Sequence, residues 1–237
     1  MSDIDTVMQD GKWTFDAEVT RVFPDMLSRS IPGMDLMREL TMSLALGPLT
    51  SREPVYVLDL GCSRGEMLDL SVKSTFFGDM HCVGVDSSVD MITYCRSTFH
   101  DENMTFVHAD IRDVEIMPNR YNVVYCILTA QFVPLEHRQA LIRNIYQGMA
   151  SGGRLFWVEK VLGSNATGQE ALTAAYDLFK KRNGYSEAQI AAKKKSLEGV
   201  LVPLQGAQNA SWLVSEGFTT VQQYWQALNF GAWMAIK

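Results

Sequence analysis

The chain has 237 residues, of which 47% are hydrophobic and 20% charged, so it can form a sizeable core without disulfide or metal support. The net charge of −6 argues against direct nucleic-acid binding, and no apolar run approaches the ~18 residues of a membrane span. The four cysteines form no C-x-x-C pair and the first residues are polar and acidic, which favours a reduced, cytoplasmic setting. The histidines show no metal-binding spacing.

The N-terminal part of the chain is predicted to be helical after a weakly ordered start at residues 1–12. Residues 13–33 mix apolar and charged side chains, and the two prolines predict one or two short helices that are broken there. Residues 34–49 have helical periodicity and end at a Gly-Pro step.

Short apolar runs alternate with helical segments from residue 54 onward. Strands are predicted over 54–61, 81–86, 104–110, 122–129 and 154–162, and helices over 66–76, 88–99 and 137–149, the last ended by Ser-Gly-Gly at 151–153. Helical segments at 165–201 and 210–216 come before two final strands at 218–226 and 229–237. This order predicts an α/β fold with a doubly wound, seven-stranded and mostly parallel sheet that ends in an antiparallel hairpin.

We expect two structural parts. Residues 1–50 form an N-terminal helical lid, and residues 51–237 form the α/β domain. A helical insertion at about 165–215 would cap the carboxyl ends of the strands, where such sheets bind ligands.

The strongest motif is V-L-D-L-G-C-S-R-G at 57–65, between a predicted strand and a helix. Gly61 and Gly65 allow a tight turn and a close approach of ligand to backbone, although an ordinary strand-to-helix turn would show the same glycines. Asp86 ends the next strand, where a carboxylate can accept both ribose hydroxyls of a nucleoside. Asp110 ends the third strand, in a position to meet an adenine edge.

The spacing of this motif is D-x-G-x-x-x-G, which differs from the G-x-G-x-x-G of NAD-binding proteins. It resembles the loop of class I S-adenosylmethionine (SAM) methyltransferases, which wraps the amino-acid end of SAM. The acidic balance and the terminal hairpin fit that superfamily.

A closer resemblance covers the chain from about Trp13 to the C-terminus. The motifs that carry it are W-T-F-D (13–16), V-F-P-D-M (22–26), R-S-I-P-G (29–33), D-L-G-C-S (59–63), D-I-R-D (110–113), I-Y-Q-G (145–148), K-R-N-G-Y-S (181–186) and N-F-G (229–231). They resemble the carboxy-SAM synthase family, which converts SAM and prephenate to carboxy-SAM for tRNA wobble-uridine modification. The resemblance implies a class I methyltransferase fold and cofactor-binding positions at Asp59, Gly61, Cys62, Ser63, Gly65, Asp86, Ser87, Asp110, Ile111, Ile127 and Lys194.

The chain departs from that family pattern at positions expected to hold ligand. Met34 replaces a tyrosine, Ile127 an asparagine, and Tyr176-Asp177 a pair of histidines. Lys194 replaces the arginine that grips the extra carboxylate, and a lysine can meet that group only as a point charge. Together these changes indicate different chemistry on the same cofactor, with neutral drift of a carboxy-SAM synthase as the alternative.

We therefore expect a SAM-utilising transferase, in the first place an enzyme that methylates a small-molecule acceptor and releases S-adenosylhomocysteine (SAH). Alternatives are the cyclisation of SAM to azetidine-2-carboxylate and methylthioadenosine, carboxy-SAM synthesis, and a non-catalytic SAM-binding subunit. Tyr176 and Asp177 are the candidate catalytic residues, because an aromatic face can stabilise a sulfonium and a hydroxyl or carboxylate can hold a proton. Tyr176 is favoured, since it lies three residues before Phe179 on one helix face. We expect no metal ion, and a homodimer is conceivable.

Overall fold

Buried apolar runs form the strands of a central sheet in the computed structural model, which describes residues 3–47, 54–73 and 79–237. The strands are β1 (Val55–Leu60), β2 (Met80–Asp86), β3 (Met104–His108), β4 (Tyr121–Ile127), β5 (Met149–Leu162), β7 (Thr220–Ala227) and β8 (Phe230–Ile236). Their order in the sheet is β3-β2-β1-β4-β5-β8-β7, and the two-residue β6 (Leu204–Gln205) pairs with β5. The predicted sheet is confirmed, with β6 as an addition.

The strands from β3 to β5 are parallel, and the C-terminal pair is antiparallel. Neighbouring residues of β5 point to opposite faces, so that Phe156 and Trp157 belong to different hydrophobic clusters. Both faces are therefore buried, as parallel strands require.

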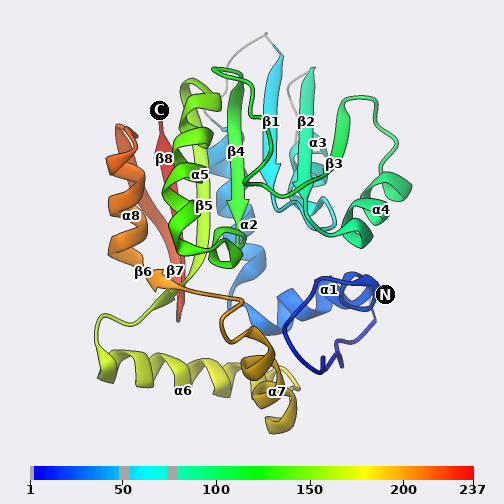
Figure 1. Cartoon of the computed structure of the whole chain (residues 1–237), viewed down its shortest axis with the longest axis vertical. Coiled ribbons are helices and arrows are strands. Elements are labelled where there is room, and N and C mark those ends of the chain that lie inside the picture. Colours follow the sequence, from blue (N-terminus) through cyan, green and yellow to red (C-terminus); the bar gives the residue numbers. More distant parts are fainter. Residues whose placement is uncertain (1–2, 48–53, 74–78) are drawn as a thin grey trace.

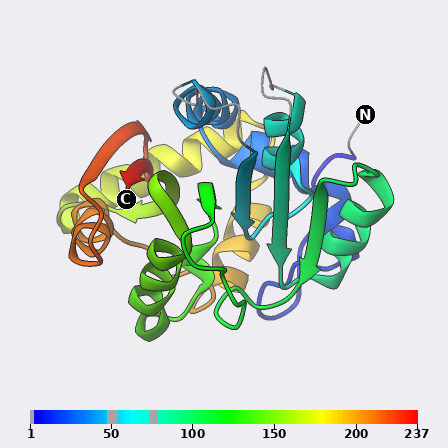
Figure 2. The same cartoon turned by 90° about the horizontal axis from the view of Figure 1, so that it is seen from above.

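Helices cover both faces of the sheet, as the view from above shows (Figure 2). One face packs against α2 (Met34–Leu46), α3 (Glu66–Lys73) and α4 (Val89–Thr98), and the other against α5 (Leu135–Gly148) and α8 (Gly206–Ser215). Three further helices, α1 (Ala17–Ser30), α6 (Ala166–Arg182) and α7 (Glu187–Leu197), lie beyond the ends toward which the parallel strands point (Figure 1). The short 3-10 helix η1 (Ala130–Phe132) follows β4. The cap helices are thus placed over the edge of the sheet where ligands bind.

The expectation of a helix broken at Pro24 is wrong, because α1 continues through this residue. A proline inside a helix leaves the carbonyl four residues earlier without its amide partner. Here that carbonyl, on Thr20, accepts a hydrogen bond from Arg64 Nη1 at 3.3 Å. A tertiary contact from the loop after β1 therefore compensates for the bond that the proline removes.

Two further expectations need correction. The Ser-Gly-Gly step does not end a helix: α5 ends at Gly148, β5 starts at Met149, and the step lies in an irregular part of the β4–β5 pairing. The start of the chain is not weakly ordered from residue 3 onward, because Asp5 and Val7 are buried. Pro48, Leu49 and residues 74–76, expected at two helix ends, lie outside the described residues, as does the predicted domain boundary at 50/51.

Candidate functional site

A cavity of about 310 Å³ lies at the carboxyl ends of the parallel strands. Its walls come from the strand ends and the loops that follow them, and from α1, α2, α6, α7 and the segment before α1. Most of the predicted site residues line it: Asp59, Gly61, Cys62, Ser63, Asp86, Ser87, Asp110, Ile111, Ile127, Tyr176 and Lys194. Gly65 and Asp177 are not part of its lining. The structure brings the predicted positions together, and their part in binding stays a prediction.

The loop after β1 requires glycine at its first turn. Gly61 has φ +80°, and a Cβ there would lie 2.2 Å from Thr129 Oγ1 at the end of β4. The amides of Gly61 and Cys62 both donate to the carbonyl of Val85, at 2.8 and 3.0 Å. The loop is thereby held between the ends of β4 and β2. Gly65 has φ +77°, and a Cβ there would lie 2.9 Å from the ring of Phe99.

Asp86 joins this loop to the start of α4. Its Oδ2 accepts from the amide of Ser63 at 2.9 Å, and its Oδ1 accepts from the amide of Ser88 at 2.8 Å. Burial raises the pKa of Asp86, while these amide donors act in the opposite direction. Each carboxylate oxygen can accept a second hydrogen bond, so the side chain keeps free acceptor capacity toward the cavity.

The next strand end carries a different kind of carboxylate. Asp110 accepts two hydrogen bonds from the guanidinium of Arg112, at 2.9 and 2.6 Å, and these bonds lower the pKa of Asp110. Ile111 beside it is 7% exposed and adds an apolar surface. This corner therefore offers an apolar face with a fixed, ionised acceptor at its rim.

Three ionisable side chains line the cavity near β1. Asp59 is 3% exposed, and burial, followed by the charge of Asp86, raises its pKa to about 8. Burial also raises the pKa of Glu66, at the start of α3. Arg38 of α2 carries the opposite charge and acts on both carboxyl groups. The Nε atom of Arg38 is buried without a hydrogen-bond partner.

A second cluster of charged side chains belongs to the cap helices α6 and α7 and to β5 beside them. Asp177 forms ion pairs with Lys194 at 2.5 Å and with Lys180 at 3.3 Å. Although burial acts in the opposite direction, these two lysines lower the pKa of Asp177. Lys160 of β5 and Lys180 lie over the Tyr176 ring, at 5.0 and 4.3 Å from its centroid. Burial, and then the charges of Lys180 and Lys194, lower the pKa of Lys160 to about 8.

Tyr176 enters the cavity and Asp177 does not, as the divergence of adjacent helical side chains predicts. The Tyr176 ring packs edge-on against Phe230 with 5.5 Å between centroids, and burial raises the pKa of its hydroxyl. Met34 and Ile127 also line the cavity, so two departures from the family pattern make its wall more apolar.

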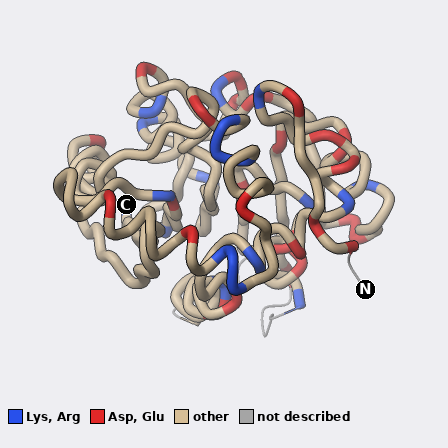
Figure 3. The backbone as a smooth tube through the Cα atoms, turned by 90° about the horizontal axis from the view of Figure 1, so that it is seen from below, with Lys and Arg blue, Asp and Glu red and all other residues tan. Residues whose placement is uncertain are grey.

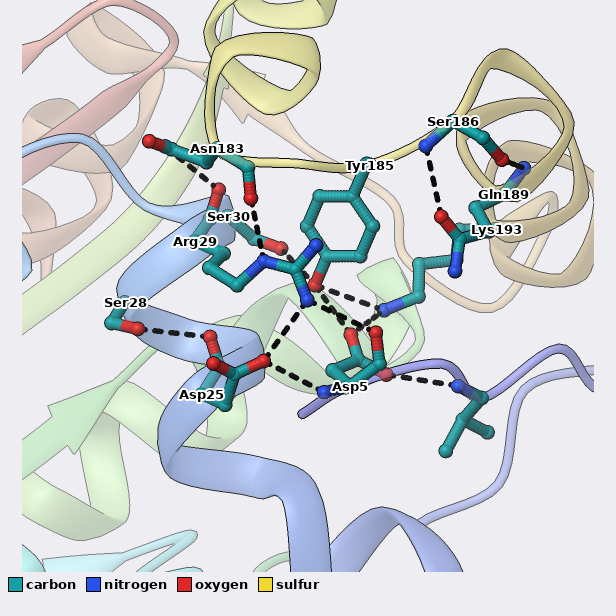
Figure 4. Close-up of polar contacts among 11 residues, drawn as sticks. Asp5, Asp25, Ser28, Arg29, Ser30, Asn183, Tyr185, Ser186, Gln189 and Lys193 are labelled. Carbon is teal, nitrogen blue, oxygen red and sulfur yellow. Dashed lines mark hydrogen bonds and ion pairs between the residues drawn. The ribbon is translucent and has the colours of Figure 1, made fainter. Parts of the chain in front are cut away.

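The segment before α1 contributes Trp13 and Phe15 to the cavity wall and is fixed by buried polar contacts around Asp5, called here the Asp5 latch and drawn in Figure 4. The Asp5 carboxylate, fully buried, accepts from the Tyr185 hydroxyl and forms an ion pair with Lys193 of α7. The Asp5 amide donates to Asp25 of α1 at 2.7 Å, and its carbonyl accepts from Arg29 at 3.1 Å. Asp5 thus connects the N-terminal segment to α1 and α7.

Six charged residues of the cavity were not among the predicted site residues: Arg38, Glu66, Arg112, Lys160, Lys180 and Lys193. Some of them left a signal in the sequence. Arg38 stands one helical turn after Met34, and Lys180 one turn after Tyr176, so each shares a helix face with a residue that the motifs had marked. Glu66 directly follows the glycine loop. Only the fold shows that Lys160 points to the same space.

No group of histidine, cysteine or acidic side chains that could hold a metal ion occurs among the described residues. In the same part of the chain no helix is long and apolar enough to cross a membrane. Basic and acidic residues are interspersed along the backbone (Figure 3).

Comparisons with known proteins agree with this architecture. A family model for a methyltransferase domain matches residues 57–153. Carboxy-S-adenosyl-L-methionine synthase of Haemophilus ducreyi is 36% identical over 234 residues, which cover 96% of this chain and 93% of the relative. The synthase of Wolinella succinogenes is 32% identical over 228 residues, with coverage of 95% and 94%.

A solved structure of a candidate SAM-dependent methyltransferase from Methanococcus maripaludis is similar with a TM-score of 0.61, covering 98% of this chain and 97% of that one. Its sequence identity of 16% makes this a likeness of fold alone. The chain therefore belongs to the carboxy-S-adenosyl-L-methionine synthase family, and it is a SAM-dependent transferase with the class I methyltransferase fold.

Proposed function

We propose that the protein uses SAM as its only substrate and transfers a carbon of its side chain to its own α-amine, which yields azetidine-2-carboxylate and methylthioadenosine. The observation that carries this proposal is the internal ion pair between Asp177 and Lys194. The carboxylate of Asp177 binds Lys194, and in the family pattern the cation at this position would hold the carboxylate of a second molecule.

Asp177 offsets part of the positive charge of the cap without an external anion. Asp177 lies between Lys194 and Lys180 and is ionised because both stabilise its carboxylate. A dianion such as prephenate would have to displace this carboxylate, and breaking such ion pairs is costly where the groups are partly buried. The aspartate takes the place of an acidic substrate and disfavours carboxy-SAM synthesis.

The size of the cavity supports a single substrate. At about 310 Å³ it lies at the lower end of the ~300–1,000 Å³ typical of small-molecule sites. A nucleoside with an amino-acid side chain fills such a space and leaves little room for an acceptor. Apolar residues of the N-terminal lid and of the helical cap, among them Phe15, Met34 and Leu197, would keep water from the reacting carbon.

The residues around β1 fit the amino-acid end of SAM. Asp59 and Glu66 can face the α-ammonium, and Arg38 can face the α-carboxylate. Asp86 and the Asp110–Ile111 corner fit the ribose and the adenine. The donors and acceptors that SAM needs are thus present along one line of strand ends.

Asp59 is the group that we assign as base. Burial raises the pKa of Asp59 to about 8 in the free protein, close to the ordinary ~8 of an α-ammonium, and the bound ammonium stabilises the ionised carboxylate beside it. Transfer of one proton from the ammonium to this carboxylate frees the amine, which forms a bond to Cγ while the Cγ–S bond breaks. The electron pair of that bond stays on sulfur, so the products are neutral methylthioadenosine and azetidine-2-carboxylate with a protonated ring nitrogen. Holding amine and Cγ in line is the main contribution of the pocket.

Methylation of a small, uncharged acceptor is the second candidate, and Lys160 favours it. Its pKa of about 8 and its place in the cavity beside Tyr176 suit a base that deprotonates an acceptor. The two reactions differ in their adenosine product. Methylation leaves SAH, whereas cyclisation leaves methylthioadenosine.

The test is to incubate the purified protein with SAM alone and analyse the products by mass spectrometry. We expect methylthioadenosine and azetidine-2-carboxylate in equal amounts, with no requirement for prephenate. Asp177→Ala should expose Lys180 and Lys194, so that small dicarboxylates inhibit this variant more strongly than the parent. Carboxy-SAM formation from SAM and prephenate by the parent protein would overturn the proposal.

A further inference from the structure

Arg38 differs from the other arginines near the cavity in having no anionic partner. Arg112 holds Asp110 through two hydrogen bonds. Arg64 bonds to the Tyr94 hydroxyl at 2.6 Å and approaches Glu66 to 3.9 Å. Among the described residues, no carboxylate lies within ion-pair distance of Arg38, although its guanidinium lines the cavity. A guanidinium has five donors, and one of them here, Nε, is buried and unused.

The fold places Arg38 at one defined end of a bound nucleoside. Asp110 follows β3, Asp86 ends β2 and Asp59 belongs to β1, and these three strands are adjacent in the sheet. With adenine at Asp110 and ribose at Asp86, the substituent on the ribose extends over β1. Arg38 reaches that point from α2, where its neighbour one turn earlier, Met34, also lines the cavity.

The chemistry of this corner matches a zwitterion. Asp59 and Glu66 are deprived of water, which makes their charged forms unfavourable in the free protein. A bound ammonium would offset that cost, and a bound carboxylate would complete the hydrogen bonds of Arg38. An α-amino acid carries both groups on one carbon, so a single ligand end satisfies all three side chains.

We propose that Arg38 binds the α-carboxylate of SAM and makes the pocket selective for ligands that retain this carboxylate, with Asp59 and Glu66 facing the α-ammonium beside it. This rests on the proposed function only in taking SAM as the molecule that fills the cavity. Planar guanidinium and carboxylate groups pair through two parallel hydrogen bonds, which fixes the direction of the amino-acid end as well as its affinity. Decarboxylated SAM, which lacks this group, would be a poor ligand.

The test compares three ligands that do not react: SAH, its decarboxylated analogue, which keeps the amine, and methylthioadenosine, which lacks the whole amino-acid end. Calorimetry on the parent protein should show SAH binding roughly 10- to 100-fold more tightly than the decarboxylated analogue, the range of a charge-assisted hydrogen bond. Arg38→Met should remove this preference by weakening SAH alone. Methylthioadenosine should bind Arg38→Met and the parent equally, which also reports that the variant is folded.

Arg143→Met serves as the matched control, because Arg143 lies on α5 and pairs with Glu216 at the surface. It should keep the full preference for SAH. Arg38→Lys should recover part of the preference, since a point charge replaces the fork. If Arg38→Met still prefers SAH as the parent does, Arg38 does not contact the carboxylate. These binding results do not depend on which product is formed, so they can fail while the proposed cyclisation stands, and the reverse.

Discussion

The strand ends and the cap meet at one cavity but differ in how far they follow the family. The loop from Gly61 to Gly65, with Asp86 and Asp110, has the motif positions that we predict to bind a nucleoside. The cap carries Tyr176, Asp177 and Lys194, where the chain departs from the family pattern and where Asp177 closes the cationic site. We propose that the strand ends determine which molecule binds, and that the cap determines whether a second molecule can enter.

In the proposed cyclisation the base is Asp59, which belongs to β1. Asp59→Asn should therefore give the largest loss, roughly 10²- to 10⁴-fold in turnover, because it removes a general base while keeping the shape of the side chain. SAM turnover by the parent and the variant is the measurement. If Asp59→Asn turns over normally, the base is elsewhere and Lys160 becomes the next residue to test.

The raised pKa of Asp59 also predicts a pH effect on stability. In the folded chain the group keeps its proton up to a pH of about 8, whereas in the unfolded chain it loses it near 3.8. Its contribution is therefore complete at low pH and is lost as the pH rises toward 8. Chemical denaturation of the parent should show falling stability over this range, and Asp59→Asn should show a smaller fall. An equal fall in both would place the pKa of Asp59 in its ordinary range.

The glycine loop can be tested by a pair of substitutions with the same backbone strain. Gly152 has φ +73° and open space around it, so Gly152→Ala should cost about 1–2 kcal/mol from the left-handed conformation alone. Gly61→Ala adds a collision with Thr129 and should cost about 1–3 kcal/mol more. Denaturant unfolding measures both. Equal losses would mean that Thr129 moves aside freely and that the strand end is less rigid than described.

Tyr176 tests the cap. Tyr176→Phe should keep the fold and SAH binding, because Phe230 and the two lysines still contact the ring. It should lower turnover roughly 10- to 100-fold if the hydroxyl orients the reacting group. Tyr176→Ala should do more damage, since the aromatic face is lost as well. Parent-like turnover in both variants would make Tyr176 a packing residue.

The smallest effect on turnover is expected from the latch. Asp5→Asn removes the charge that pairs with Lys193 and should weaken lid closure by about 1–3 kcal/mol. Hydrogen exchange of residues 5–16 should become faster in the variant, and SAH should slow it in the parent more than in the variant. Exchange that does not change with SAH in either protein would contradict a lid that closes on the ligand.

Local patterns predicted the sheet because the buried strands are short apolar runs and periodic helices follow β1, β2 and β4. They failed at Pro24, since the hydrogen bond that sustains α1 comes from Arg64, more than forty residues later. The glycine and acidic positions of the site were readable because backbone turns and strand ends impose them. Lys160 was not, because only the tertiary fold brings this residue of β5 to the same cavity. The Asp5 latch was missed for the same reason: its partners lie in α1 and α7.

The account is tested most directly by following the labelled atoms of SAM that carries ¹³C in its methyl group and ¹⁵N in its α-amine. Cyclisation predicts that all ¹³C stays on methylthioadenosine and that ¹⁵N appears in the four-membered ring of azetidine-2-carboxylate. The ratio of the two products should be one to one, with no added acceptor. Transfer of ¹³C to another molecule, with release of SAH that keeps ¹⁵N in its α-amine and carries no ¹³C, would contradict cyclisation and establish methylation in its place.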